Sequence, residues 1–104
     1  MLTDPFAFLP IEHLEDCGFV AKGEGGKFFE EGRGEPGSAL PINTHGGLLC
    51  GVHDGVSPLI HHTIEAIRQL RGQAGRRQVK NAEKAFIQLH GGMMQHHATM
   101  ILGR

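Results

Sequence analysis

The sequence feature that most constrains the fold is a set of apolar residues at helical spacing between residues 58 and 71. Its members are Ile60, Ile64, Ile67 and Leu70. Such separations place the side chains on one face of an α-helix. Ser57 and Pro58 supply an N-cap and a first-turn proline, and Gly72 supplies a C-terminal stop. The sequence therefore predicts a helix over 58–71 with an apolar stripe on one face.

Two apolar segments follow this helix and have the composition of strands. They are "KAFIQLH", residues 84–90, and "HATMIL", residues 97–102, and the segment "GGMMQ" lies between them. A glycine-containing connection this short joins antiparallel neighbours. We therefore expect an antiparallel strand pair at the end of the chain.

The first half of the chain is less regular. Asp4–Pro5 predicts a helix start, Pro10 predicts its restart, and Gly18 its end. Residues 21–40 contain six glycines, and a connection of that length is typical of a binding loop or a disordered segment. Residues 41–43 predict a short strand. The order helix, long loop, strand, helix, strand pair is an α/β pattern, and 104 residues allow one domain, 1–104.

Composition excludes several functional classes. The formal net charge is −1, which gives no electrostatic basis for binding nucleic acid or an anionic membrane. No segment approaches the ~20 apolar residues of a membrane span. No signal peptide opens the chain, so Cys17 and Cys50 are expected to be reduced. These features predict a cytoplasmic protein.

Eight histidines raise the question of a metal site. His61–His62 and His96–His97 are adjacent pairs, and neighbouring side chains point in different directions on a helix or strand. The sequence has no HExxH, no CxxC and no histidine pair at i, i+4 within a predicted helix. We therefore expect no specific metal site.

The segment "INTHGGLLCGVHDG", residues 42–55, allows several interpretations. Cys50 could be a nucleophile with His53 as its base, or a small packed side chain, as we expect for Cys17. Alternatively, the glycines could bring backbone N–H groups close to a ligand beside His53. "LHGG", residues 89–92, repeats this theme after a strand, so the two turns could converge at one end of a sheet. Ordinary turns without a ligand remain a third interpretation.

Several segments in order resemble the C-terminal part of thiolase-superfamily proteins. They are "LEDCGFVAKGEGGKFFEEG", "LPINTHGGLLCGVHDG", "EAIRQLRG" and "LHGGMM". The resemblance is strongest to the sterol-carrier-protein-type, or lipid-transfer, thiolases. It covers essentially all of this chain but only about the last quarter of such a protein.

The resemblance implies acyl-CoA chemistry, with the coenzyme A thioester as substrate and no bound cofactor. His53 in "GVHDG" matches the family's "GHPxG" histidine, which activates a nucleophilic cysteine and helps form an oxyanion hole. Asp54 stands where that motif has proline. "NTHGG" matches a loop near the acyl chain or CoA, which makes its residues candidate substrate contacts. These are Asn43, His45, Gly46 and Gly47.

Two further family positions have changed residues. The turn that carries the family's second catalytic cysteine aligns with "QLHGGMM", so His90 is the candidate acid/base there, beside Gly91 and Gly92 as substrate contacts. The "NEAF" motif maps onto "TDPFA", so Thr3 replaces the oxyanion-hole asparagine. These changes disfavour thiolysis and Claisen condensation, and they are compatible with the retro-aldol cleavage of acyl-CoA by some thiolase-like complexes.

The nucleophile-bearing half of a thiolase is missing from this sequence. The resemblance also implies that the first two strands of the C-terminal sheet are missing, which leaves the strand at 41–43 separated from the final pair. Unpaired strand edges are unstable. We therefore expect a larger thiolase-like partner subunit, self-association, or membership of a longer protein.

Overall fold

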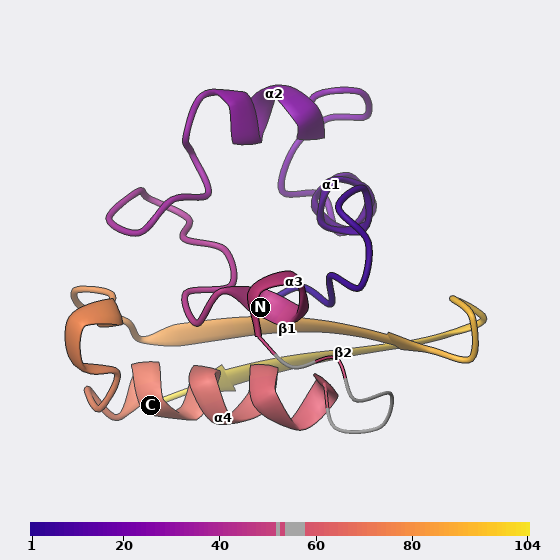
Figure 1. Ribbon diagram of the computed structural model, residues 1–104. Helices are drawn as coiled ribbons and strands as arrows, with labels where there is room; N and C mark the ends of the chain where they lie inside the picture. The colour runs from indigo at the N-terminus through magenta and orange to yellow at the C-terminus, as the bar shows by residue number, and fades with distance from the viewer. Residues whose placement is uncertain (52, 54–57) are drawn as a thin grey trace.

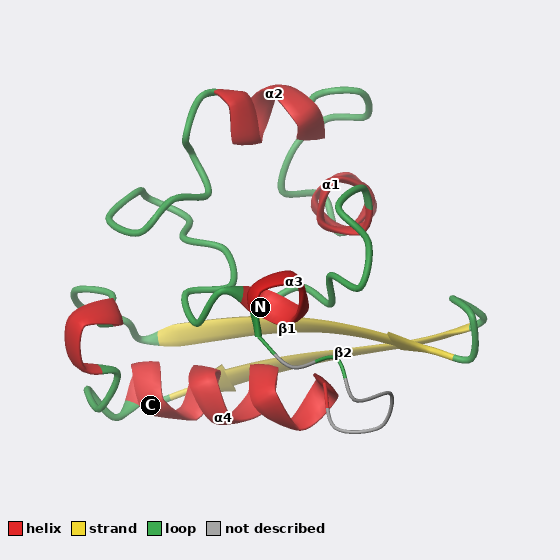
Figure 2. Ribbon diagram, viewed as in Figure 1, coloured by secondary structure: helices red, strands yellow, loops and turns green. Residues whose placement is uncertain are grey.

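The sheet consists of two antiparallel strands in the computed structural model, which describes residues 1–51, 53 and 58–104. β1 (Lys84–Gly91) pairs with β2 (His96–Gly103) along their whole length, from Lys84 opposite Gly103 to Gly91 opposite His96. The intervening turn has positive φ at Gly92, Met93 and Met94. Figures 1 and 2 show this long hairpin, and the predicted strand pair is confirmed.

The two faces of the hairpin carry different cores. Ile87 and Leu89 point towards α4 (Pro58–Leu70) and pack with Ala66. Phe86, one residue along the strand, points to the other side and packs against a second cluster built on Leu2, Leu14 and Phe28. Figure 1 accordingly shows α4 on one side of the hairpin and α1, α2 and α3 on the other.

Helix α4 confirms the predicted helix, but only Leu70 of its predicted apolar stripe is fully buried. The side chains buried against the hairpin are His62, Glu65, Ala66, Gln69 and Leu70. Ile60 and Ile64 lie on the outward side and are 58% and 39% exposed. The inward face accepts polar groups because most of them bond to neighbouring loops, as described below. The predicted N-cap, Ser57, lies outside the described residues.

Helix α1 (Leu9–Asp16) begins at the second of the two predicted starts. Pro10 occupies its first turn, and Gly18, with φ +76°, follows its end. The prediction that Asp4 caps this helix is wrong. Its carboxylate instead accepts the backbone N–H of Leu48, in α3 (Gly47–Cys50), at 2.8 Å. Asp4 thus binds α3, and the helix α1 begins only after Pro5.

The long glycine-rich connection contains α2 (Gly25–Glu30), which packs near α1. Phe28 of α2 is 2% exposed, and its ring stacks edge-on with Phe29 at a centroid distance of 5.4 Å. Residues 21–40 are thus an ordered segment held by one buried aromatic side chain.

The predicted strand at 41–43 does not form. Asn43 has φ +45°, which ends an extended conformation, and its side-chain amide pairs with the backbone of Leu2 at 2.7 Å in both directions. The residues beside β1 are instead Met1–Thr3. Leu2 bridges Gln88 in parallel orientation.

Among the described residues, no helix is both long enough and apolar enough to cross a membrane.

Candidate functional site

The predicted glycine loop forms a tight turn around an internal carboxylate. Gly46 and Gly47 have φ values of +99° and +66°. A Cβ atom on Gly47 would lie 2.7 Å from Asp4 Cγ, 2.8 Å from Oδ1 and closer still to Oδ2. Burial raises the pKa of Asp4, although hydrogen bonds from the Leu48 and Leu49 backbone oppose this shift. The amide groups at the start of α3 therefore bind Asp4, a residue that the sequence analysis had placed elsewhere.

Two imidazoles, one buried and one half-buried, lie beside this turn. His62 of α4 is completely buried, and its ring meets that of His45 edge-on at a centroid distance of 5.0 Å. Burial lowers the pKa of His62 to about 3 and also lowers that of His45. His62 Nε2 is 3.7 Å from Asp4 Oδ1, beyond hydrogen-bond distance. His62 is therefore a neutral imidazole beside the Asp4 carboxylate, and these two side chains do not form an ion pair.

Both ring nitrogens of each of these histidines are buried without a hydrogen-bond partner among the described residues. A neutral imidazole always carries one N–H group, so two buried donors are unsatisfied. Such groups cost about 1–3 kcal/mol each. The described residues therefore leave hydrogen-bonding groups of His45 and His62 without partners at this place.

A polar network fixes the loop against α4. The buried carboxylate of Glu65 accepts bonds from Thr44 Oγ1 at 2.8 Å, Gln69 Nε2 at 3.0 Å and Arg77 Nη2 at 3.0 Å. Burial alone would raise the pKa of Glu65, but these three partners together hold it below its ordinary value. These bonds explain how α4 can bury the charged side chain of Glu65. They also fix the position of Thr44, which precedes His45.

Asn43 shapes this loop through its side chain. Its Oδ1 accepts the Leu2 N–H and its Nδ2 donates to the Leu2 carbonyl. Both amide groups thus have partners within the protein. The loop-shaping role predicted for Asn43 is compatible with this geometry, while a contact to substrate would require one of these bonds to open.

The Asn43 bonds give a simple prediction. Asn43→Ala is expected to lower the free energy of unfolding by about 2–4 kcal/mol, because it removes two hydrogen bonds and leaves a residue with a Cβ at positive φ. Urea unfolding measures this loss. Asn81→Ala, at φ +57° in another loop, is the matched control for backbone strain, and an equal loss in both variants would contradict a bonding role for Asn43.

His53 follows α3 and has an exposed side chain. Residues 52 and 54–57, which include Asp54, lie outside the described residues. Cys50 is exposed, so its interpretation as a packed side chain is wrong. Cys17 is half-buried, and burial raises the pKa of its thiol, as expected of a packing residue.

His90 lies in a group of three imidazoles at the end of β1. Its ring centroid is 5.6 Å from that of His13 on α1 and 6.4 Å from that of His97 on β2. His90 and His97 are register partners, which explains why both project from the same face. His13 Nε2 and His90 Nδ1 are buried without a hydrogen-bond partner in the described part of the chain.

The electrostatics of this group favour neutral rings. Burial lowers the pKa of His13 to about 4, helped by His90 and His97, and burial and His97 lower the pKa of His90. A neutral imidazole with an open nitrogen can accept or donate a proton. Across residues 1–51, 53 and 58–104, no group of three or more His, Cys, Asp or Glu side chains is placed to hold a metal ion.

Gly91 and Gly92 follow His90 directly, and Gly92 has φ +57°. Of the other predicted substrate positions, Asn43 and Gly46 line an open cavity of about 350 Å³, whereas His45 and Gly47 are not among its lining residues. Figure 1 shows the hairpin turn projecting beyond the helices, while α3 lies over the middle of β1. The sequence-predicted residues thus fall into two groups, one at α3 and one at the hairpin end.

The sequence alone did not predict a site role for two residues of these groups, His13 and His62. His13 carried no signal, because a single histidine in an amphipathic helix is usually surface-exposed. His62 was considered only with His61, and the two do point apart, one exposed and one buried. Thr3 is also buried, and its hydroxyl donates to the Gln88 carbonyl at 2.8 Å. It therefore holds the strand segment in this structure.

The chain is similar to several known proteins. The chain is 40% identical to an acetyl-CoA acetyltransferase of Methanothermobacter thermautotrophicus over 97% of its own length and 26% of that protein. It is 41% identical to a 17-hydroxy-3-oxo-4-pregnene-20-carboxyl-CoA lyase of Mycobacterium tuberculosis over 69% of its length and 18% of the lyase.

Sterol carrier protein 2 of Bos taurus is 34% identical over 82% of the chain and 16% of that protein. The chain thus spans about a quarter or less of the length of these relatives. The family described as thiolase C-terminal domain-like matches residues 1–104 in full. The chain therefore belongs to the thiolase C-terminal domain-like family.

Proposed function

We propose that this chain is the C-terminal portion or small subunit of a thiolase-like acyl-CoA enzyme, which transfers acyl groups or cleaves carbon–carbon bonds of acyl-CoA thioesters. The nucleophilic cysteine comes from a larger thiolase-like subunit or from a preceding part of a longer protein. The observation that carries the proposal is the 40% identity to an acetyl-CoA acetyltransferase over nearly the whole chain.

His53 is the proposed base. It takes the proton of the nucleophilic thiol, and its N–H then stabilises the oxyanion of the thioester adduct. Its exposed side chain supports this role, because the groups that it serves belong to the other part of the enzyme. The glycine turn with Gly46, Gly47 and His45 borders the acyl or CoA site.

His90 is the proposed second acid/base, with Gly91 and Gly92 beside the substrate. Its open, buried Nδ1 and its lowered pKa support proton exchange by a neutral ring. For one active site to use both histidines, the larger part must bridge the α3 region and the hairpin end.

The surface of α4 supports association with a larger part. Ile60 and Ile64 expose apolar side chains on its outward face, whereas helices at a solvent boundary usually keep this face polar. A partner subunit is one way to cover them and self-association is another. We place the protein in the cytoplasm, where the free thiols of Cys17 and Cys50 would stay reduced.

An alternative function is a non-catalytic one, in which the chain binds CoA or lipid or completes the fold of a thiolase-like subunit, including one in a retro-aldolase complex. The relatives named as a pregnene-carboxyl-CoA lyase and a steroid side-chain-cleaving aldolase favour carbon–carbon cleavage in such a complex. The engagement of Thr3 and Asp4 within the protein also fits a structural role.

A chimera tests both functions. The matched region of the Methanothermobacter acetyl-CoA acetyltransferase is replaced by residues 1–104, and formation and thiolysis of acetoacetyl-CoA are measured. We expect activity in the chimera and a loss of about 100-fold or more in kcat in its His53→Ala variant, the usual effect of removing a general base. His90→Ala is expected to reduce kcat without abolishing binding.

His61→Ala, which changes an exposed imidazole on α4, is the matched control. A folded chimera that binds acyl-CoA without turnover would favour the non-catalytic function. An active chimera that tolerates His53→Ala would remove His53 from the mechanism.

A further inference from the structure

His90 lies on the face of β1 that α1 covers. Successive side chains of a strand alternate between its two faces, so His90 and Phe86 point to the same side of the hairpin. Phe86 packs there against the cluster that contains Leu14 of α1. His13 precedes Leu14 on that helix and is 4% exposed. The fold thus places the imidazoles of His13 and His90 at the same interface.

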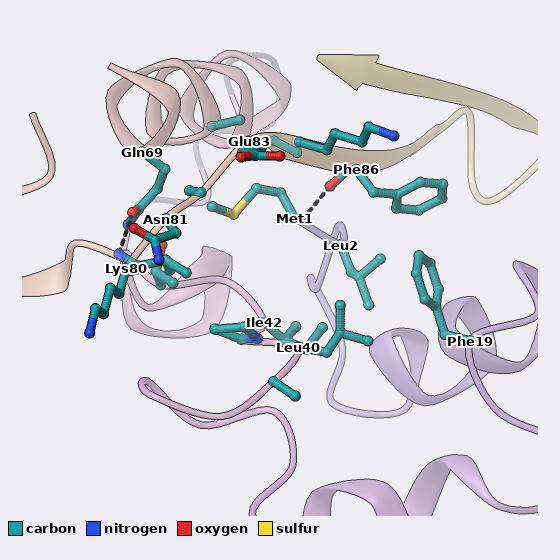
Figure 3. Close-up of a pocket in the computed structure, with 18 of the residues that line it drawn as sticks. Met1, Leu2, Phe19, Leu40, Ile42, Gln69, Lys80, Asn81, Glu83 and Phe86 are labelled. Atoms are coloured by element: carbon teal, nitrogen blue, oxygen red, sulfur yellow. Dashed lines mark hydrogen bonds between the residues drawn. The ribbon is translucent and has the colours of Figure 1, made fainter. Parts of the chain in front are cut away.

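The backbone that carries His90 is held on both edges of β1. On one edge, His90 and His97 of β2 are register partners. On the other edge, Thr3 N–H donates to Gln88 O at 3.0 Å, and Gln88 N–H donates to Met1 O at 2.9 Å. Figure 3 shows this second edge, with Met1 beside the strand. The sheet therefore sets the position of His90, and its ring can turn only about its own side-chain torsions.

The rings of His13 and His90 present open nitrogen atoms at this interface. Their centroids are 5.6 Å apart and their planes are tilted by 38°. His13 Nε2 and His90 Nδ1 are both buried without a hydrogen-bond partner among the described residues. The outer torsion of histidine is broad, so small turns of the two side chains can bring these nitrogens within hydrogen-bond distance. One bond would then satisfy both atoms, and unsatisfied buried polar groups are unfavourable.

The other titratable groups that face the pair are engaged elsewhere. His97 Nε2 lies 3.0 Å from the carbonyl oxygen of Met94, and because a carbonyl oxygen only accepts, this nitrogen carries hydrogen. The His97 side chain is also exposed. Asp16 on α1 forms an ion pair with Lys22. Neither His97 nor Asp16 bonds the two buried nitrogens.

We propose that His13 is a positioning residue for His90, whose Nδ1–H group donates a hydrogen bond to His13 Nε2. This bond fixes the tautomer of His90, because the hydrogen bond of one ring nitrogen determines which nitrogen carries the hydrogen. The lone pair of the neutral ring then lies on Nε2, away from His13. The catalytic role of this arrangement rests on the proposed function of His90, whereas the pairing of the two rings rests on the contacts described above.

The bond keeps its direction through a proton transfer. When His90 Nε2 takes a proton from the substrate, the ring becomes an imidazolium with two N–H donors. Its Nδ1–H still donates to His13 Nε2, and the ring returns to its first tautomer when Nε2 releases the proton. Burial lowers the pKa of His13 to about 4, which keeps its Nε2 lone pair free to accept. His13 therefore supports proton exchange without itself carrying the proton.

NMR spectra of the ring nitrogens in the full chain test the pairing. At pH 7.5 we expect His90 to be a single tautomer with hydrogen on Nδ1. His13→Leu should release a mixture of the two tautomers, because no acceptor remains. His13→Gln should keep the single tautomer, because its side-chain oxygen can accept the same bond. His97→Gln changes the neighbouring ring and is the matched control, which should also keep the tautomer.

The unmodified chain alone can overturn the pairing, through a mixture of His90 tautomers or through a single tautomer with hydrogen on Nε2. A folded His13→Leu variant that keeps the Nδ1–H tautomer would overturn it as well. Release of the tautomer by His97→Gln and not by His13→Leu would assign the partner role to His97, which also contradicts the proposal.

Kinetics of the chimera test the catalytic consequence. We expect His13→Leu to lower kcat by about tenfold to 100-fold with little change in KM, because it misaligns a group that acts in the chemical step. His13→Gln should recover most of this loss. In a His90→Ala background, His13→Leu should cause no further loss, because the two residues act as a unit.

An equal loss with and without His90 would overturn the positioning role of His13. A chimera without any activity would overturn the proposed function and the catalytic role together, whereas the NMR spectra alone decide whether the two rings are paired.

Discussion

Gly47→Ala is expected to lower the free energy of unfolding by about 2–5 kcal/mol, a large fraction of the ordinary stability of a small domain. Two effects combine. A residue with a Cβ is strained by about 1–2 kcal/mol at φ +66°. The Cβ would also overlap the carboxylate of Asp4, and such overpacking typically costs about 1–3 kcal/mol.

The matched control is Gly72→Ala at the end of α4. Gly72 has a similar φ of +70°, but a Cβ there would meet nothing within 4 Å. It should therefore cost only the backbone strain, about 1–2 kcal/mol. Urea unfolding followed by circular dichroism compares the two variants. If Gly47→Ala is no more harmful than Gly72→Ala, the close approach of Asp4 does not hold the turn.

Mild acid is expected to destabilise the protein strongly. His13 and His62 are neutral in the folded state, with pKa values lowered to about 4 and about 3 by burial. In the unfolded chain they bind protons near pH 6.5. The unfolded state therefore binds more protons below that pH, and stability falls as the pH drops from about 6.5 towards 4. Between pH 7 and 5 each histidine contributes a loss of about 2 kcal/mol.

Thermal unfolding between pH 7.5 and 4.5 measures this loss. His13→Phe removes one of the histidines with a lowered pKa and should make the pH dependence less steep. The substitution can also change the midpoint at pH 7 for packing reasons, so the slope is the quantity to compare. Gly72→Ala, which changes no titratable group, should leave the slope almost unchanged. A slope that is unaffected by His13→Phe would show that His13 is protonated, or accessible to protons, in the folded state.

The parts of the fold predicted from the sequence are those with a local pattern. The stripe in α4, the apolar strands and the short glycine turn between them each act within about ten residues. Pro10 and Gly18 likewise mark the limits of α1 through backbone chemistry alone. The family resemblance was confirmed because several motifs in order are specific even where single motifs are not.

Two of the incorrect predictions involve competition between distant segments. Asp4 has the chemistry of an N-cap, but the amide groups of α3 across the fold take its carboxylate. Residues 41–43 have strand composition, yet Met1–Thr3 lies on the available edge of β1 and Asn43 bonds to it. A local sequence pattern does not show which of two segments binds a partner that both could use.

The candidate site was partly predictable for the same reason. The glycines around His45 and after His90 are local signals, and the structure places them in turns. The partners of His90 are not local, because His13 comes from another helix and His97 from the facing strand. Only the register of the hairpin and the packing of α1 bring the three rings together.

The exposed apolar residues on the outward face of α4 have a consequence for the abundance of this protein in a cell. Ile60 and Ile64 are exposed on one side of the molecule, and the free edge of β2, "HHATMILG", contains no Lys, Arg, Asp or Glu. Surfaces of this kind attract chaperones, proteases and other copies when they are left uncovered. The supply of the chain would have to match the supply of whatever covers it, so its abundance would be set by assembly rather than by its own rate of synthesis.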